Sequence, residues 1–124
     1  MFNEILLEKV NLVIESIELI EERFSSIKNP DDLVLSPQGL MVLDSISMRL
    51  QVIGEQIKGI DKLDGDLLTR YQTIEWQKIM RLRDLISHHY QDIDHEMIYS
   101  ICRKDLLPLK EVLKRISTEL TRHF

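Results

Sequence analysis

Apolar residues recur at intervals of three or four along most of the chain, which is the spacing of one face of an α-helix. The first such stretch covers about residues 3–28, and its apolar positions are Val10, Val13, Ile17, Ile20, Phe24 and Ile27. The second runs to about residue 60, and its apolar positions are Leu43, Ile46, Leu50, Ile53, Ile57 and Ile60. Each stretch therefore predicts a long helix with one buried face.

Local signals mark where these helices begin and end. Pro30 predicts a break after the first helix, because proline disfavours helix at the residue before it. Ser36-Pro37 predicts a new start, since serine caps helices and proline is tolerated at the first helical position. Gly54 interrupts the second stripe at a cost of about 1 kcal/mol relative to alanine, so we expect close helix packing there. Residues 61–73 are polar and predict a connection with at most one helical turn.

Two further helices complete the predicted fold. The third begins near residue 74 or 75, ends near residues 88–90, and turns four apolar residues inward, Trp76, Ile79, Leu82 and Ile86. Asp94 is a candidate N-cap for the fourth, with Glu96 in its first turn. Pro108 splits this last helix, ending one piece at Asp105 or Leu107 and opening the next. We expect an all-α, antiparallel, up-and-down bundle of four to five helices, with residues 1–124 as one domain.

Composition and charge narrow the classes of protein that fit. One cysteine excludes an internal disulfide framework, and no apolar stretch reaches the roughly 20 residues of a membrane span. The N-terminal stretch lacks the basic start of a signal peptide, so we expect a cytoplasmic protein with no membrane contact. The net charge of −5 combines −7 over residues 1–68 with +2 over residues 69–124. Such a chain is not built to coat nucleic acid, but its C-terminal half can engage a phosphate locally.

Residues 83–95 hold the candidate chemistry, since three of the four histidines fall there with an arginine and a tyrosine. Arg83 can bind a phosphate, and His88 can transfer a proton in phosphodiester cleavage. On a regular helix the two residues differ by about 140° in azimuth and 7.5 Å in rise. Fraying at Ser87–His88, or a site assembled across a dimer interface, would bring them together. In the structural alternative, Arg83 pairs with Asp84, Asp92 or Asp94, and the histidines cap the helix end.

The stretch Arg83-x4-His88-x-Tyr90 resembles the Arg-x4-His-x-Tyr signature of HEPN domains, specifically of the HepT-like toxin family. The resemblance continues in Ile53-Gly54-Glu55, in Ile74-Glu75-Trp76 and in Asp92-Ile93-Asp94. It also includes Asp105-Leu106-Leu107-Pro108-Leu109, so it covers most of residues 36–116. Glu75 stands where the family has proline, and Asp84 stands where it most often has asparagine.

This resemblance implies a dimeric, metal-independent RNA endonuclease with no cofactor, the toxin of a toxin–antitoxin pair. The nucleophile is the RNA's own 2′-hydroxyl, Arg83 stabilises the phosphorane, and His88 carries the proton. Asp84 is a supporting residue that orients these side chains, although its charge opposes phosphate binding. Tyr90 matches the tyrosine that an MNT-type nucleotidyltransferase antitoxin modifies with AMP. This modification would add phosphate charge beside Arg83, fill the cleft between the two motif regions and so silence the enzyme. In the alternative reading, Tyr90 is a half-buried tyrosine with a local hydrogen bond.

Other readings of these residues remain open. His89 is expected at the surface or an interface, and Cys102 in the core. A zinc site built from histidines and Asp92 lacks a known spacing, so we expect no metal. The alternative function is a non-catalytic helical subunit that partners or presents substrate to a nucleotidyltransferase. A cleft shared by Arg83, His88 and Tyr90 would favour catalysis, whereas burial and pairing of these residues within one chain would exclude it.

Overall fold

The computed structural model describes residues 2–88 and 93–122, and all regular structure in that part is helical. The longest helices are α1 (Phe2–Phe24) and α2 (Pro37–Leu63), with a 3-10 turn, η1 (Pro30–Leu33), between them. Four short helices follow, namely α3 (Gly65–Thr69), α4 (Trp76–Met80), α5 (Leu82–His88) and α6 (His95–Ser100). A π-helical turn, η3 (Ile101–Asp105), leads into α7 (Leu106–Thr121).

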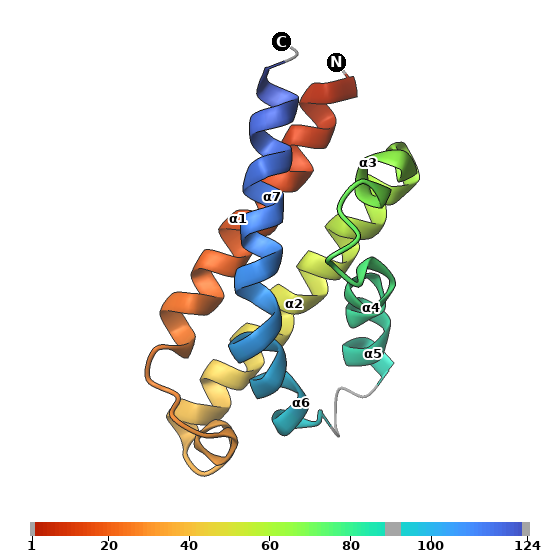
Figure 1. The fold of residues 1–124 in the computed structure, drawn as a ribbon. Coiled ribbons are helices and arrows are strands. Elements are labelled where there is room, and N and C mark those ends of the chain that lie inside the picture. The colour runs from red at the N-terminus through yellow and green to blue at the C-terminus, as the bar shows by residue number, and fades with distance from the viewer. Residues whose placement is uncertain (1, 89–92, 123–124) are drawn as a thin grey trace.

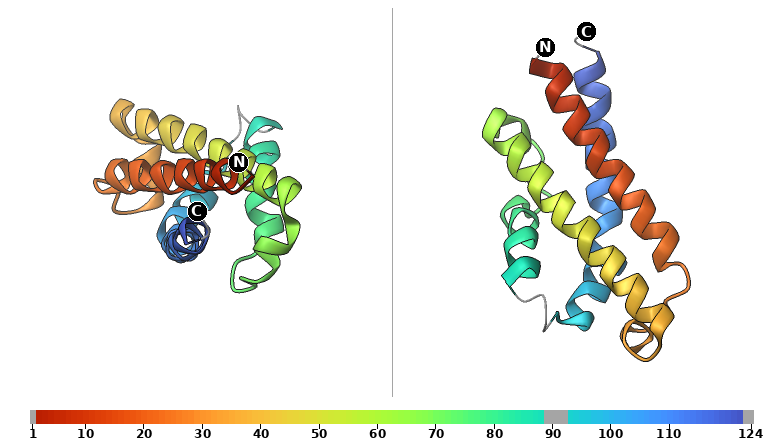
Figure 2. Two further views of the ribbon diagram at one scale, coloured as in Figure 1. Left: turned by 90° about the horizontal axis from the view of Figure 1, so that it is seen from above. Right: turned by 180° about the vertical axis from the view of Figure 1, so that it is seen from behind.

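The helix α2 is the centre of the arrangement. It packs against α1 on one side and against α4 and α5 on another, while α7 packs against α1 (Figures 1 and 2). Helix α1 runs antiparallel to both α2 and α7, as Figure 1 shows. Motif residues on α5 are therefore held in place chiefly by α2.

The core is formed by the two predicted stripes and their partners on the later helices. Every predicted apolar position of α2 is buried, and so are five of the six in the first predicted stripe, namely Val10, Val13, Ile17, Ile20 and Ile27. On the later helices the predicted inward residues Trp76, Ile79, Leu82 and Ile86 are also buried, as are Leu109, Val112, Ile116 and Leu120. The helical periodicity thus identifies most of the core correctly.

Side-chain caps fix the helix starts that the sequence predicts. The Ser36 hydroxyl accepts a hydrogen bond from the Gly39 amide at 2.9 Å, and Pro37 is the first residue of α2. The Asp94 carboxylate accepts bonds from the amides of Glu96 and Met97, which starts α6 directly after the motif region. Each cap satisfies amides that the helix itself leaves without a partner.

Two of the predicted helices differ in detail from the structure. Helix α1 ends at Phe24 rather than near residue 28, where the Ser25 hydroxyl bonds the Glu22 carbonyl at 2.7 Å and competes with the helical pattern. The third predicted helix is two short ones, α4 and α5, interrupted at Arg81. The predicted division before Pro108 is confirmed, since the π-helical turn η3 ends at Asp105 and α7 begins at Leu106 with Pro108 in its first turn.

The predicted fold class is nevertheless confirmed. With α4 and α5 taken as one arm, and α6, η3 and α7 as another, the described chain has four helical arms and the short α3. Within residues 2–88 and 93–122 the long helices are α1, α2 and α7, whereas the third helix predicted from about residue 74 onward is divided into the short α4 and α5. No helix in the described ranges is both long and apolar enough to cross a membrane.

Candidate active site

The short helix α5 presents the motif because its two faces differ in polarity. Leu82 and Ile86, one turn apart, are 3% and 1% exposed and anchor the helix to the core. Arg83, Asp84 and Ser87 lie on the other side and are exposed. The core contact thus fixes which residues of the motif helix can reach a ligand.

Arg83 lies at the surface, with half of its side chain exposed, and contacts two carboxylates. Its Nε forms an ion pair with Glu55 Oε2 at 2.6 Å, and its Nη1 donates a hydrogen bond to Asp84 Oδ1 at 3.5 Å. The predicted contact with Asp84 is therefore present, but the shorter contact is to Glu55 on α2. Asp94, another predicted partner, instead caps α6.

The end of α5 at Ser87 and His88 is helical. The Ser87 hydroxyl donates to Gln51 Oε1 on α2 at 2.8 Å, which ties this last turn to the neighbouring helix. The helical backbone keeps Arg83 and His88 about 140° apart in azimuth. The side chain of His88 lies outside the described part of the chain.

Other predicted site residues fall after α5. His89, Tyr90 and Asp92 lie outside the described residues. His95 Nε2 lies 3.4 Å from Asp31 Oδ1 of η1, a carboxylate that the considered zinc set did not include. Among residues 2–88 and 93–122, no group of three or more potential ligands is placed to hold a metal ion.

Sequence reasoning missed the roles of Glu55 and Gln51. Glu55 was part of the family resemblance, in Ile53-Gly54-Glu55, but had no role beside the motif. The available signal was Gly54: a Cβ there would lie 3.0 Å from both the Arg83 amide nitrogen and the Ile79 carbonyl oxygen. A glycine inside a helix indicates where another backbone comes close, and here that backbone carries Arg83.

Cys102, predicted in the core, is half-buried and packs against it. Burial raises the pKa of its thiol to about 12, so the neutral form predominates at neutral pH. It follows Ile101, which is 4% exposed, in the π-helical turn. Cys102 is thus a packing residue rather than a nucleophile.

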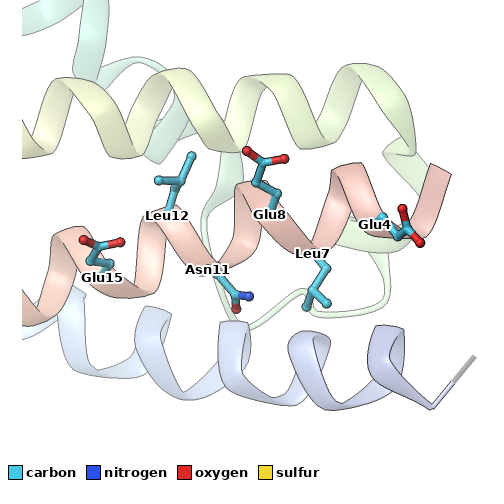
Figure 3. Close-up of a pocket in the computed structure, with 6 residues that line it drawn as sticks. All are labelled: Glu4, Leu7, Glu8, Asn11, Leu12 and Glu15. Carbon is cyan, nitrogen blue, oxygen red and sulfur yellow. The ribbon is translucent and has the colours of Figure 1, made fainter. Parts of the chain in front are cut away.

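A shallow hollow lies on α1, away from the motif helix. Figure 3 shows its six lining residues, Glu4, Leu7, Glu8, Asn11, Leu12 and Glu15. Glu8 and Leu12 point towards the side of α2, and Leu7 points towards α7. Three glutamates make this hollow unsuited to a phosphate.

A helical bundle with Arg83 and His88 five positions apart on one helix has the architecture of the HEPN class. The chain matches the family model described as Ribonuclease HepT-like over residues 13–116, and it belongs to that family. The matched residues include α5 and the two residues of α2 that contact it, Gln51 and Glu55.

Curated relatives point in the same direction. A protein of Methanocaldococcus jannaschii named "Gamma-glutamylcyclotransferase and putative RNase" is 32% identical over 92% of this chain and 48% of its own length. A "Probable ribonuclease HepT" of Thermococcus cleftensis is 28% identical over 84% of this chain and 88% of its own length. The chain spans about half the length of the first relative and 59% of a second Methanocaldococcus jannaschii protein. No solved structure gives a significant match.

Proposed function

We propose that this chain is a metal-independent endoribonuclease that acts as the toxin of a toxin–antitoxin pair. The observation that carries the proposal is an exposed Arg83 on the same regular helix as His88, in a chain of the HepT-like family. An arginine fork suits a phosphate, and histidine titrates close enough to neutrality to carry a proton.

The reaction uses the RNA's own 2′-hydroxyl as nucleophile. Its oxygen attacks the adjacent phosphorus and loses its proton, while the 5′-oxygen leaves and takes up a proton. The products are a 2′,3′-cyclic phosphate and a 5′-hydroxyl end. Arg83 stabilises the charge on the phosphorane oxygens, and His88 transfers protons.

A second copy of the chain completes this site. Two proton transfers are needed, and each chain supplies one motif histidine. Because the α5 helix separates Arg83 and His88 by about 140°, one phosphate is not readily reached by both from a single regular helix. A homodimer with its α5 helices facing each other places the Arg83 of one copy near the His88 of the other.

An MNT-type nucleotidyltransferase is the antitoxin in this proposal. Transfer of AMP to the Tyr90 hydroxyl, with pyrophosphate leaving ATP, adds a phosphodiester and a nucleoside beside the motif and blocks RNA. The exposed Glu4, Glu8 and Glu15 of α1 offer an acidic surface to a basic partner (Figure 3).

One observation favours the alternative function, a non-catalytic subunit that partners a nucleotidyltransferase. The guanidinium of Arg83 already contacts the carboxylates of Glu55 and Asp84, which compete with a phosphate. Such a subunit would bind its partner protein and leave RNA intact.

The deciding experiment is an RNA cleavage assay in the presence of a chelator, with the wild type, Arg83→Ala and His88→Ala. We expect the wild type to release 2′,3′-cyclic phosphate ends and each variant to lose at least about 100-fold in kcat/KM. Circular dichroism establishes that the variants fold, and mass spectrometry that Tyr90 is unmodified. A folded, unmodified wild type that leaves RNA intact would refute catalysis and favour the partner subunit.

A further inference from the structure

Two polar contacts connect α2 to the motif helix, one helical turn apart. Glu55 on α2 contacts Arg83 on α5, and Gln51 on α2 contacts Ser87 on α5. Gln51 and Glu55 are four residues apart, as are Arg83 and Ser87, so each pair lies on one face of its helix. We refer to these two contacts, Glu55–Arg83 and Gln51–Ser87, as the α2–α5 ladder.

Gly54 allows this ladder to form. Its position faces the backbone of Ile79 and Arg83, and a Cβ there would come within 3.0 Å of both. The helices therefore approach more closely than two ordinary side chains would permit. The next residue, Glu55, is thereby brought within hydrogen-bond distance of the Arg83 side chain at 2.6 Å.

The contact engages one edge of the guanidinium. Glu55 binds Nε, and the two Nη atoms of an arginine carry four further N–H donors, the edge that forks onto a phosphate. Asp84 Oδ1 lies 3.5 Å from Nη1, beyond the 2.7–2.9 Å of a strong charge-assisted hydrogen bond. Glu55 is thus the closer of the two carboxylate contacts, and it lies at Nε, whereas Asp84 accepts the hydrogen bond from Nη1.

We propose that Glu55 is a positioning residue that aims Arg83 at the scissile phosphate, and that Gln51 fixes the helix end next to His88 through Ser87. The inference rests on the proposed ribonuclease function. A free arginine side chain populates many rotamers, and the Glu55 contact removes much of that freedom before RNA binds. Positioning of this kind accelerates the chemical step rather than substrate binding.

This role predicts opposite effects on binding and turnover. Removing the Glu55 carboxylate takes a negative charge away from the approaching RNA, so KM stays the same or falls. The same change releases Arg83, so kcat falls. If Glu55 only stabilised the fold, its removal would not lower kcat while leaving KM unchanged or lower.

The activity test compares Glu55→Ala and Glu55→Gln with Glu111→Ala, which removes the same charge from the exposed side of α7. We expect kcat to fall about 10- to 100-fold in Glu55→Ala, with KM unchanged or lower. Glu55→Gln is expected to recover part of this loss, because its amide oxygen still presents a partial negative charge to the guanidinium. Glu111→Ala is expected to match the wild type. A kcat of Glu55→Ala within twofold of wild type, or no recovery in Glu55→Gln, overturns the proposal.

A second readout separates this inference from the ribonuclease proposal. The Nε–Hε signal of Arg83 in an NMR spectrum, assigned by its loss in Arg83→Lys, reports the contact without any RNA. We expect the chemical shift of this signal to differ between the wild type and Glu55→Ala, because the ion pair places a carboxylate beside Nε. An inactive wild type with this signal difference refutes only the ribonuclease function. Identical signals in wild type and Glu55→Ala overturn the positioning role even when RNA is cleaved.

Discussion

The Arg83 side chain lies at the surface and contacts a residue from a distant part of the sequence, Glu55. The motif spacing singled out Arg83, and the sequence also supplied Asp84 as a neighbour. Glu55 lies 28 positions earlier, and no local pattern connects the two residues. Their contact depends on the packing of α2 against α5, so the side-chain arrangement could not be predicted from periodicity alone.

Asp84 gives a prediction at this scale, because its carboxylate lies 3.5 Å from Arg83 Nη1 and repels phosphate. We expect Asp84→Asn to bind RNA about two- to fivefold more tightly at low salt, with the difference shrinking as salt rises. Fluorescence anisotropy with 2′-O-methyl RNA, which lacks the nucleophile, measures this. Asp44→Asn removes an equally negative, exposed carboxylate about three turns before Glu55 on α2 and serves as control. Equal affinities of Asp84→Asn and wild type at low salt would contradict the prediction.

At the scale of elements, the apolar stripes and the caps could be read from the sequence. Ser36 and Asp94 start their helices as predicted, since capping depends only on residues within one turn. The interruption at Arg81 and the π-helical turn at Ile101–Asp105 were not predicted. Both preserve the 3.6-residue spacing closely enough for the apolar stripe to continue, so periodicity alone does not reveal them.

Gly54 gives the prediction for helix packing. A Cβ at this position would meet backbone atoms at 3.0 Å, which cannot move without displacing α4 or α5. We expect Gly54→Ala to lower the free energy of unfolding by about 1–3 kcal/mol. Urea unfolding followed by circular dichroism measures the change.

Gly59, also on α2, is the matched control. A Cβ there meets only the flexible end of the Lys9 side chain, at 3.2 Å from its Nζ. Alanine is favoured over glycine in a helix by about 1 kcal/mol, so Gly59→Ala is expected to be neutral or stabilising. Equal stability of the two alanine variants would show that α2 and α5 do not need the close approach.

At the scale of the whole molecule, a polar cluster ties the middle of the chain to its last helix. Arg70 and Tyr71, which follow α3, contact the Glu119 carboxylate on α7, with the tyrosine hydroxyl donating at 2.6 Å. Hydrogen bonding to Glu119, together with burial and the charge of Glu119, raises the pKa of Tyr71 above its ordinary value of 10.0. The helical bundle could be predicted from the sequence, but these contacts could not. Their partners are 48 and 49 residues apart in the sequence.

This cluster predicts a stability contribution that depends on pH. Because the pKa of Tyr71 is higher in the folded state, its contribution is fully present below pH 10 and is lost as the pH rises through the folded-state pKa. We expect Tyr71→Phe to cost roughly 1 kcal/mol at pH 8 and less above pH 10. Urea unfolding from pH 8 to 11 measures both differences.

Glu119→Gln provides the control for this prediction. It keeps a hydrogen-bond acceptor for the tyrosine but removes the carboxylate charge, so the alkaline loss of stability is expected to be smaller than in the wild type. A stability difference between Tyr71→Phe and wild type that stays constant up to pH 11 would show that Tyr71 titrates as it does in the unfolded chain.

The first turn of α1 and the last turn of α7 lie at one end of the bundle, while the end of α5 and the start of α6 lie at the other (Figures 1 and 2). The first turn of α1 and the last turn of α7 therefore lie close together. A protein module joined to either terminus would emerge at the end of the bundle opposite the end of α5. Tethering such a module, or linking the two termini and reopening the chain between α1 and α2, would rearrange its connectivity without crowding the end that carries α5.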